Sequence, residues 1–183
     1  MPLNLQRTLG FALLAIRSHR ISVAGLALMG LMTIFASNLL EVIGFLYDAL
    51  DNMRAIKNAR TASRVYNKPI LNYGCGITDF GDVNADICER KVPHFKLIPP
   101  SPAPTPFRDG FFAAAICSNV MEHVPDPGAL KEELNRVASR TFFVNPSPLF
   151  TFSWLYPEHL WIFIRGRAYR IRGEAPNLEA RTV

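Results

Sequence analysis

The hydrophobic residues of this chain are unevenly distributed, and the longest apolar run lies near the N-terminus. Residues 21–40 (ISVAGLALMGLMTIFASNLL) contain no charged side chain, and apolar residues continue to Tyr47. About 20 helical residues cross the hydrocarbon core of a bilayer. A buried core helix and a signal peptide are the alternatives, but polar residues are scarce and the small-residue cleavage pattern is poor. We therefore predict one transmembrane helix over residues 21–47.

The segments on either side of this run differ in charge. Residues 1–20 are apolar with Arg7, Arg17 and Arg20, which predicts an amphipathic segment at the membrane interface. Residues 48–68 are charged and helical in pattern, which predicts a linker helix that ends near Asn67, before Pro69. Basic side chains near the span are more numerous after it than before it, so we expect the soluble domain on the cytoplasmic side.

Short apolar runs mark the strands of a soluble domain over residues 69–148. We predict strands at residues 70–73, 83–87, 113–118 and 141–145, with a helix over residues 126–138. A proline-rich loop covers residues 98–106. Strands that alternate with loops and helix predict an α/β fold with a mostly parallel sheet. Ligands of such sheets bind at the carboxyl ends of the strands.

Two features follow the first two predicted strands. Gly74-Cys75-Gly76 comes directly after the first strand, and Asp86 lies at the end of the second. Glycines admit a close ligand and unusual dihedrals, and exposed amides there could face a carboxylate or phosphate. Asp86 is placed to accept hydrogen bonds from two ribose hydroxyls. A Gly-x-Gly sequence by itself also marks an ordinary tight turn.

Two stretches resemble motifs of the class I S-adenosylmethionine-dependent methyltransferases, within them the type 11 group. ILNYGCGITDFGDVNADI resembles the cofactor motif, and PFRDGFFAAAICSNVMEHVPDPGALKEELNRV resembles the fourth-strand region. The resemblance covers residues 69–145 and implies S-adenosylmethionine as cofactor and a Rossmann-like methyltransferase sheet. That sheet is truncated, because little sequence follows Asn145. It further implies that Gly74, Cys75 and Gly76 lie under the methionyl part of the cofactor and that Asp86 holds its ribose.

The resemblance also implies roles at the end of the strand at residues 113–118. Cys117, Ser118 and Asn119 would line the cofactor floor near the sulfonium, with Glu122 and His123 on the following turn. Methyl transfer is an in-line displacement, and a weak nucleophile needs a base to take its proton. His123 is the candidate base, since an imidazole has a pKa near 6.5. Alternatively, Glu122 and His123 cap the next helix and hold the loop.

The C-terminal segment, residues 149–183, is aromatic and basic. Residues 149–164 (LFTFSWLYPEHLWIFI) precede four arginines at positions 165, 167, 170 and 172. Aromatic rings beside arginines favour a membrane-interfacial anchor. The alternative is a final core element, and the alternation of Phe150, Phe152, Trp154 and Tyr156 is typical of a strand with one buried face.

Composition and charge exclude several function classes. The chain has 183 residues with 49% hydrophobic and 19% charged, which argues against disorder and against two full catalytic domains. The net charge of +5 fits an anionic lipid surface, and no nucleic-acid motif accompanies it, so no nucleic-acid partner is expected. Cysteines without Cys-x-x-Cys spacing, and Glu-His pairs at 122–123 and 158–159 outside a metalloprotease pattern, predict no metal site.

Two function hypotheses follow. The first is a single-pass membrane-anchored methyltransferase that acts on a lipid, a quinone or another membrane-proximal small molecule. The second is a catalytically inactive accessory subunit of a larger membrane protein complex that keeps the fold for docking. The second is favoured by Thr78 where the family has a glycine, by Asn72 in place of an acid, and by the lack of an adenine-facing acid in the proline-rich loop.

Overall fold

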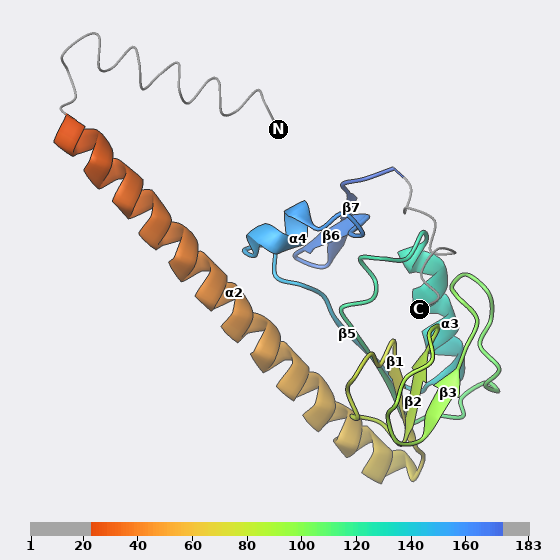
Figure 1. The fold of residues 1–183 in the computed structure, drawn as a ribbon. Coiled ribbons are helices and arrows are strands. Elements are labelled where there is room, and N and C mark those ends of the chain that lie inside the picture. The colour runs from red at the N-terminus through yellow and green to blue at the C-terminus, as the bar shows by residue number, and fades with distance from the viewer. Residues whose placement is uncertain (1–22, 174–183) are drawn as a thin grey trace. The chain divides into compact units, whose positions relative to one another are not determined.

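The computed structural model describes residues 23–173. The predicted interfacial segment, residues 1–20, lies outside the described residues, as do residues 21–22 and 174–183. The chain divides into two units between Val42 and Ile43. Figure 1 labels the helices and strands.

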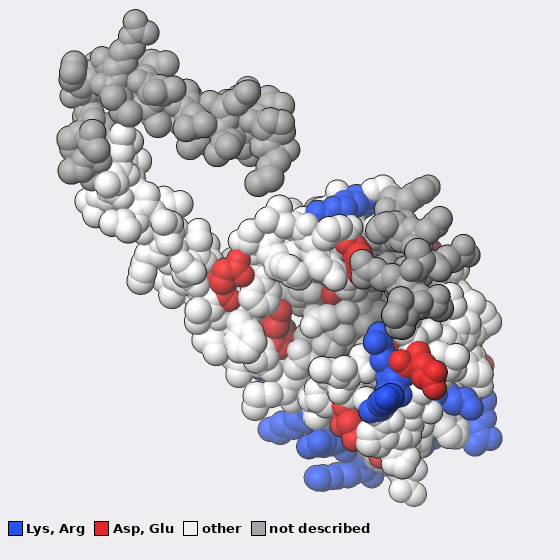
Figure 2. Space-filling model, viewed as in Figure 1, with Lys and Arg blue, Asp and Glu red and all other residues white. Residues whose placement is uncertain are grey.

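The first described element is α2, one helix of 44 residues from Val23 to Tyr66. The predicted transmembrane helix and the predicted linker helix are therefore one helix, because no proline or turn sequence separates them. From Gly25 onward α2 is long and apolar enough to span a membrane. Large apolar side chains of its N-terminal part are exposed, including Leu31 at 65% and Phe35 at 71%. Figure 2 shows an uncharged surface along this part of the helix.

The second unit contains a parallel sheet of five strands. The strands are β1 (Ile70–Tyr73), β2 (Val83–Asp86), β3 (Phe95–Leu97), β4 (Ala114–Ser118) and β5 (Thr141–Val144), in the order β3-β2-β1-β4-β5. The predicted α/β class with a parallel sheet is confirmed, and four of these strands lie where the sequence predicts them. The sequence does not predict β3, which is short, mostly exposed and at the sheet edge.

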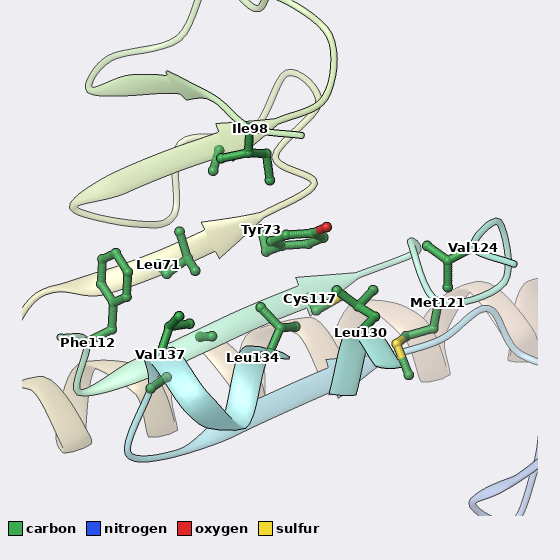
Figure 3. Close-up of a cluster of buried hydrophobic side chains, with 13 residues drawn as sticks. Leu71, Tyr73, Ile98, Phe112, Cys117, Met121, Val124, Leu130, Leu134 and Val137 are labelled. Atoms are coloured by element: carbon green, nitrogen blue, oxygen red, sulfur yellow. The ribbon is translucent and has the colours of Figure 1, made fainter. Parts of the chain in front are cut away.

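Each face of the sheet is covered by one helix. Residues of β1 and β4 alternate between faces, as the period of two requires. Ile70 and Ile116 pack with the alanines of α2, of which Ala59 is fully buried. Leu71 and Cys117 face α3 (Pro127–Val137). Figure 3 shows the side chains of α3 directed toward these strands.

The local sequence determines where the helix α3 begins and which face it buries. The Asp126 carboxylate caps it by accepting a hydrogen bond from the Ala129 amide at 3.0 Å, and Pro127 occupies the first turn. Leu130, Leu134 and Val137 recur at helical spacing and are buried. The predicted helix over residues 126–138 is confirmed.

The C-terminal segment folds into a short helix and a hairpin. These are α4 (Thr151–Leu155), β6 (Trp161–Ile164) and β7 (Arg167–Arg170), with β6 and β7 antiparallel in a sheet of their own. The alternation of Phe150 to Tyr156 suits a strand, but residues 151–155 form the helix α4. The hairpin segment docks on the loop between β4 and α3. The Leu160 amide donates to the Glu122 carbonyl at 2.7 Å, and the Trp161 indole donates to the Val124 carbonyl at 2.9 Å.

Candidate functional site

A cavity of about 430 Å³ opens at the carboxyl ends of β1, β2 and β4. This volume lies in the range of small-molecule sites, and the position is the one where parallel sheets bind ligands. Of the residues predicted for the cofactor, Gly74, Gly76, Asp86 and Asn119 line the cavity, and so does the predicted base His123. The fold thus brings residues from three strand ends around one space.

The glycine turn after β1 is shaped by close packing. Gly74 has φ +67°, and a Cβ there would lie 2.3 Å from Cγ2 of Val120. Glycine fits this position because it adopts a positive φ without strain and leaves room for the Val120 side chain. The amides of Gly74 and Cys75 donate to the Ala85 carbonyl, and the Gly76 amide donates to Asp86 Oδ2 at 2.9 Å. These amides are engaged within the chain, so the expectation that they face a ligand is not met.

The Asp86 carboxylate is already hydrogen-bonded in the structure. Its Oδ1 accepts from the Cys88 amide at 3.0 Å, and its Oδ2 accepts from Gly76 and from Arg90 Nε at 3.2 Å. Asp86 is buried, while the Arg90 side chain is 39% exposed at the cavity wall. A ribose at this position would use the free acceptor capacity of Oδ1, or it would displace the guanidinium of Arg90.

His123 faces the cavity from the loop after β4. Burial is the main cause that lowers its pKa below the ordinary value of 6.5, so the imidazole is neutral at pH 7. Its Nδ1 lies 3.2 Å from the Glu158 carbonyl, which can only accept, so Nδ1 carries the hydrogen and Nε2 the lone pair. A neutral imidazole with a free Nε2 can take a proton or bind a metal.

The other predicted site residues do not line the cavity. Cys75 and Cys117 are buried, and burial raises the pKa of both thiols, so neither is a thiolate at pH 7. The Ser118 hydroxyl donates to Asn52 Oδ1 of α2 at 2.8 Å. Their predicted contact with a cofactor stays a prediction that the geometry does not support.

Glu122 lies behind the cavity wall and is 1% exposed. Among the described residues, neither carboxyl oxygen has a hydrogen-bond partner. Burial raises the pKa of Glu122 to about 8, which keeps the carboxyl protonated at neutral pH. Its Oε1 lies 3.8 Å from His123 Nε2. The expected helix-capping role of Glu122 is not observed, because Asp126 caps α3.

Several residues of this site are not predicted from the sequence. Arg90 and Ile98 line the cavity, and His159 lies beside Glu122 and His123. The repeated Glu-His pairs were the available signal for His159, but their proximity depends on how the hairpin docks.

Known proteins give no further guide to these residues. No protein-family model, no curated protein and no solved structure matches the chain.

Proposed function

We propose that this chain is a membrane-anchored methyltransferase with a Rossmann-like fold. It binds S-adenosylmethionine in the cavity above β1, β2 and β4 and methylates a lipid, a quinone or another membrane-proximal small molecule. The observation that carries the proposal is the convergence of Gly74, Asp86 and His123 on one cavity at the strand ends. The strand order β3-β2-β1-β4-β5 supports it, since the first five strands of doubly wound nucleotide-binding sheets have this order.

The residues present fit the cofactor in volume and in polarity. Tyr73, Ile98 and Val124 give the cavity an apolar wall, and Asp86 offers an acceptor beside it. Asp86 would hold the ribose, and Asn119 lies at the end of β4 beside His123. When bound, S-adenosylmethionine supplies an electrophilic methyl group on a sulfonium.

The chain's own contribution to the transfer is positioning and proton removal. His123 would accept the proton of the nucleophile as that nucleophile bonds to the methyl carbon and the carbon–sulfur bond breaks. The neutral state of His123 at pH 7 suits this role, because a protonated imidazole has no lone pair to offer.

Membrane attachment rests on two exposed apolar surfaces. In α2, a span of about 20 residues suffices for a bilayer, which leaves the part after Ile43 to pack on the sheet. In the C-terminal segment, Phe152 is 63% and Leu155 61% exposed on α4. Phe150 of the same segment packs against Gly44 of α2. This contact supports an interfacial position for the exposed aromatic and aliphatic side chains of α4. We propose single-pass topology with the α/β domain in the cytoplasm.

The accessory-subunit function is a second candidate with its own support. The amides of the glycine turn donate hydrogen bonds within the chain, and Arg90 already donates a hydrogen bond to the Asp86 carboxylate. A domain kept only for docking has no need to leave these groups free for a cofactor.

Calorimetric titration of the full chain in detergent with S-adenosylmethionine tests the proposal. We expect a Kd near 1 μM, about −8 kcal/mol. Asp86→Asn should weaken binding at least about tenfold, because it removes the charge that holds the ribose. Glu89→Gln is the matched control, since Glu89 is an exposed acid in the same loop. A folded wild-type protein that gives no binding heat would overturn the enzyme function and favour the accessory subunit.

A further inference from the structure

Three side chains with metal-ligating atoms meet behind the cavity wall. They are Glu122 and His123 of the loop after β4 and His159 of the segment before β6. One ligand atom from each lies within 4.8 Å of the other two. Glu122 and His159 are buried, and the side chain of His123 is 33% exposed. Two imidazoles and one carboxylate are a donor set that first-row divalent ions use.

The hydrogen bonds of the two imidazoles direct the same nitrogen of each ring to the centre. His123 Nδ1 lies 3.2 Å from the Glu158 carbonyl, and His159 Nδ1 lies 2.9 Å from the Ser153 carbonyl. A carbonyl oxygen only accepts, so both Nδ1 atoms carry hydrogen and both Nε2 atoms carry a free lone pair. Metal-binding histidines are held in this way, with the second ring nitrogen donating to a carbonyl or carboxylate.

The carboxyl group of Glu122 supplies the independent observation. Both of its oxygens are buried and lack a hydrogen-bond partner among the residues that the structure describes. Buried polar groups are almost always partnered, because an unpartnered one costs about 1–3 kcal/mol or more. A cation between Glu122 and the two Nε2 atoms would satisfy this carboxylate.

The backbone around the three side chains is fixed by hydrogen bonds. The Leu160 amide, next to His159, donates to the Glu122 carbonyl at 2.7 Å. Arg172 Nη1 donates to the His159 carbonyl at 2.8 Å. The two chain segments that carry the ligands are thus tied together, which reduces the ordering that binding would require.

We propose that Glu122, His123 and His159 bind one divalent transition-metal ion, for which zinc is the expected ion. Zinc accepts two imidazoles and a carboxylate and leaves a fourth position for water or substrate. His123 lines the cavity, so this open position lies beside the proposed cofactor site. Ligands of one zinc ion lie about 3.4 Å apart in a tetrahedron, so small side-chain rotations bring the three atoms together. Calcium and magnesium fit less well, since they prefer oxygen ligands.

This inference does not require S-adenosylmethionine. A bound ion would occupy Nε2 of His123, so metal binding and proton acceptance by His123 exclude one another in the same molecule. Calorimetric titration with S-adenosylmethionine measures cofactor binding through Asp86 separately. The cofactor proposal and the metal proposal can therefore fail independently of one another.

Zinc titration of the EDTA-treated full chain in detergent tests the site. The background carries Cys88→Ser, because Cys88 is an exposed free thiol that could bind zinc by itself. We expect one zinc ion per chain, with micromolar or tighter affinity. His123→Asn, His159→Asn and Glu122→Gln should each lower that affinity at least about tenfold.

The substitutions are chosen to keep the fold. Asparagine retains a donor close to the position of Nδ1, so it can keep the hydrogen bond to the backbone carbonyl while it removes Nε2. His94→Asn is the matched control, because His94 is exposed, is not part of the cluster and has φ +52°, which asparagine tolerates. Its zinc affinity should equal that of the parent.

Cobalt substitution gives a second readout that needs no variant to fold. Co²⁺ in a four-coordinate site absorbs strongly in the visible, so the folded parent protein should show this absorption. A folded parent protein without stoichiometric zinc binding would overturn the proposal. So would equal zinc affinity in the parent and in all variants of the cluster that fold.

Discussion

Replacement of Glu122 by glutamine in the metal-free protein should change how stability depends on pH. The carboxyl is 1% exposed, and burial raises its pKa from 4.5 to about 8. Below pH 4.5 the carboxyl is protonated in both the folded and the unfolded chain, so its burial carries no charge penalty. Between pH 4.5 and 8 the unfolded chain releases the proton and the folded chain keeps it. Stability therefore falls by about 1.4 kcal/mol per pH unit over this window and levels off above it.

The magnitude follows from the same values. Because the pKa rises from 4.5 to about 8, the parent protein loses about 5 kcal/mol of unfolding free energy above pH 8, relative to pH 4.5. At pH 7 the loss is about 3 kcal/mol. Glutamine has a similar shape and does not titrate. The free energy of unfolding of Glu122→Gln, minus that of the parent, should therefore rise by these amounts as pH increases from 4.5. Other titrating groups cancel in the difference, because both proteins contain them.

Urea unfolding at pH 5, 6, 7 and 8 in detergent and EDTA measures this difference. Trp154 and Trp161 are the two tryptophans of the chain. Both belong to the C-terminal segment that covers Glu122, so their fluorescence reports when this segment detaches during unfolding. The exposed Glu89→Gln provides the control for loss of one negative charge and should give a constant difference. A constant difference for Glu122→Gln as well would refute the reasoning that the buried carboxyl titrates with a raised pKa.

Three further predictions concern packing and membrane contact. Gly74→Ala should lower the free energy of unfolding by about 1–3 kcal/mol, because its Cβ would meet Val120 and its φ is +67°; urea unfolding measures this loss. Leu134→Ala should cost about 2–5 kcal/mol in the same assay, since Leu134 is fully buried under the sheet; a loss below about 1 kcal/mol would contradict this packing. In vesicles, brominated lipid should quench the fluorescence of Trp154 more than that of Trp161, because Trp154 is exposed on α4 while the Trp161 indole donates to the Val124 carbonyl. Single-tryptophan variants separate the two signals. Equal quenching would oppose an interfacial α4.

The sequence predicted the parallel sheet well, because its strands are buried on both faces and therefore appear as short apolar runs. Residues 70–73 are all buried, and this pattern is readable as an apolar run between a proline and a glycine turn. The strand at Phe95–Leu97 was not predictable in the same way, because a three-residue edge strand with a central lysine has no periodicity. The sequence left a strand or a helix open at residues 150–156, since alternating aromatics over so few residues fit either structure, and residues Thr151–Leu155 form a helix.

The site was predictable only where its residues follow strands directly. Gly74, Asp86 and Asn119 each lie just after or at the end of a predicted strand, and the rule for parallel sheets brings them together. His159 comes from a segment whose place depends on hydrogen bonds to the Glu122 and Val124 carbonyls. No local pattern encodes those contacts, so its approach to His123 could be found only in the folded chain.

The C-terminal segment has buried and exposed apolar side chains, so it carries features of both alternatives that the sequence offered. Leu160 and Ile162 are buried and complete the core over the loop after β4, while Phe152 and Leu155 of α4 stay exposed. A segment that served only as core cover would bury these side chains, and a pure membrane anchor would not place His159 against Glu122. The same short stretch therefore connects the exposed apolar surface to the buried carboxyl. If α4 lies at the membrane and the ion is bound, the open ligand position lies beside a cavity close to the bilayer, where an amphiphilic substrate would arrive.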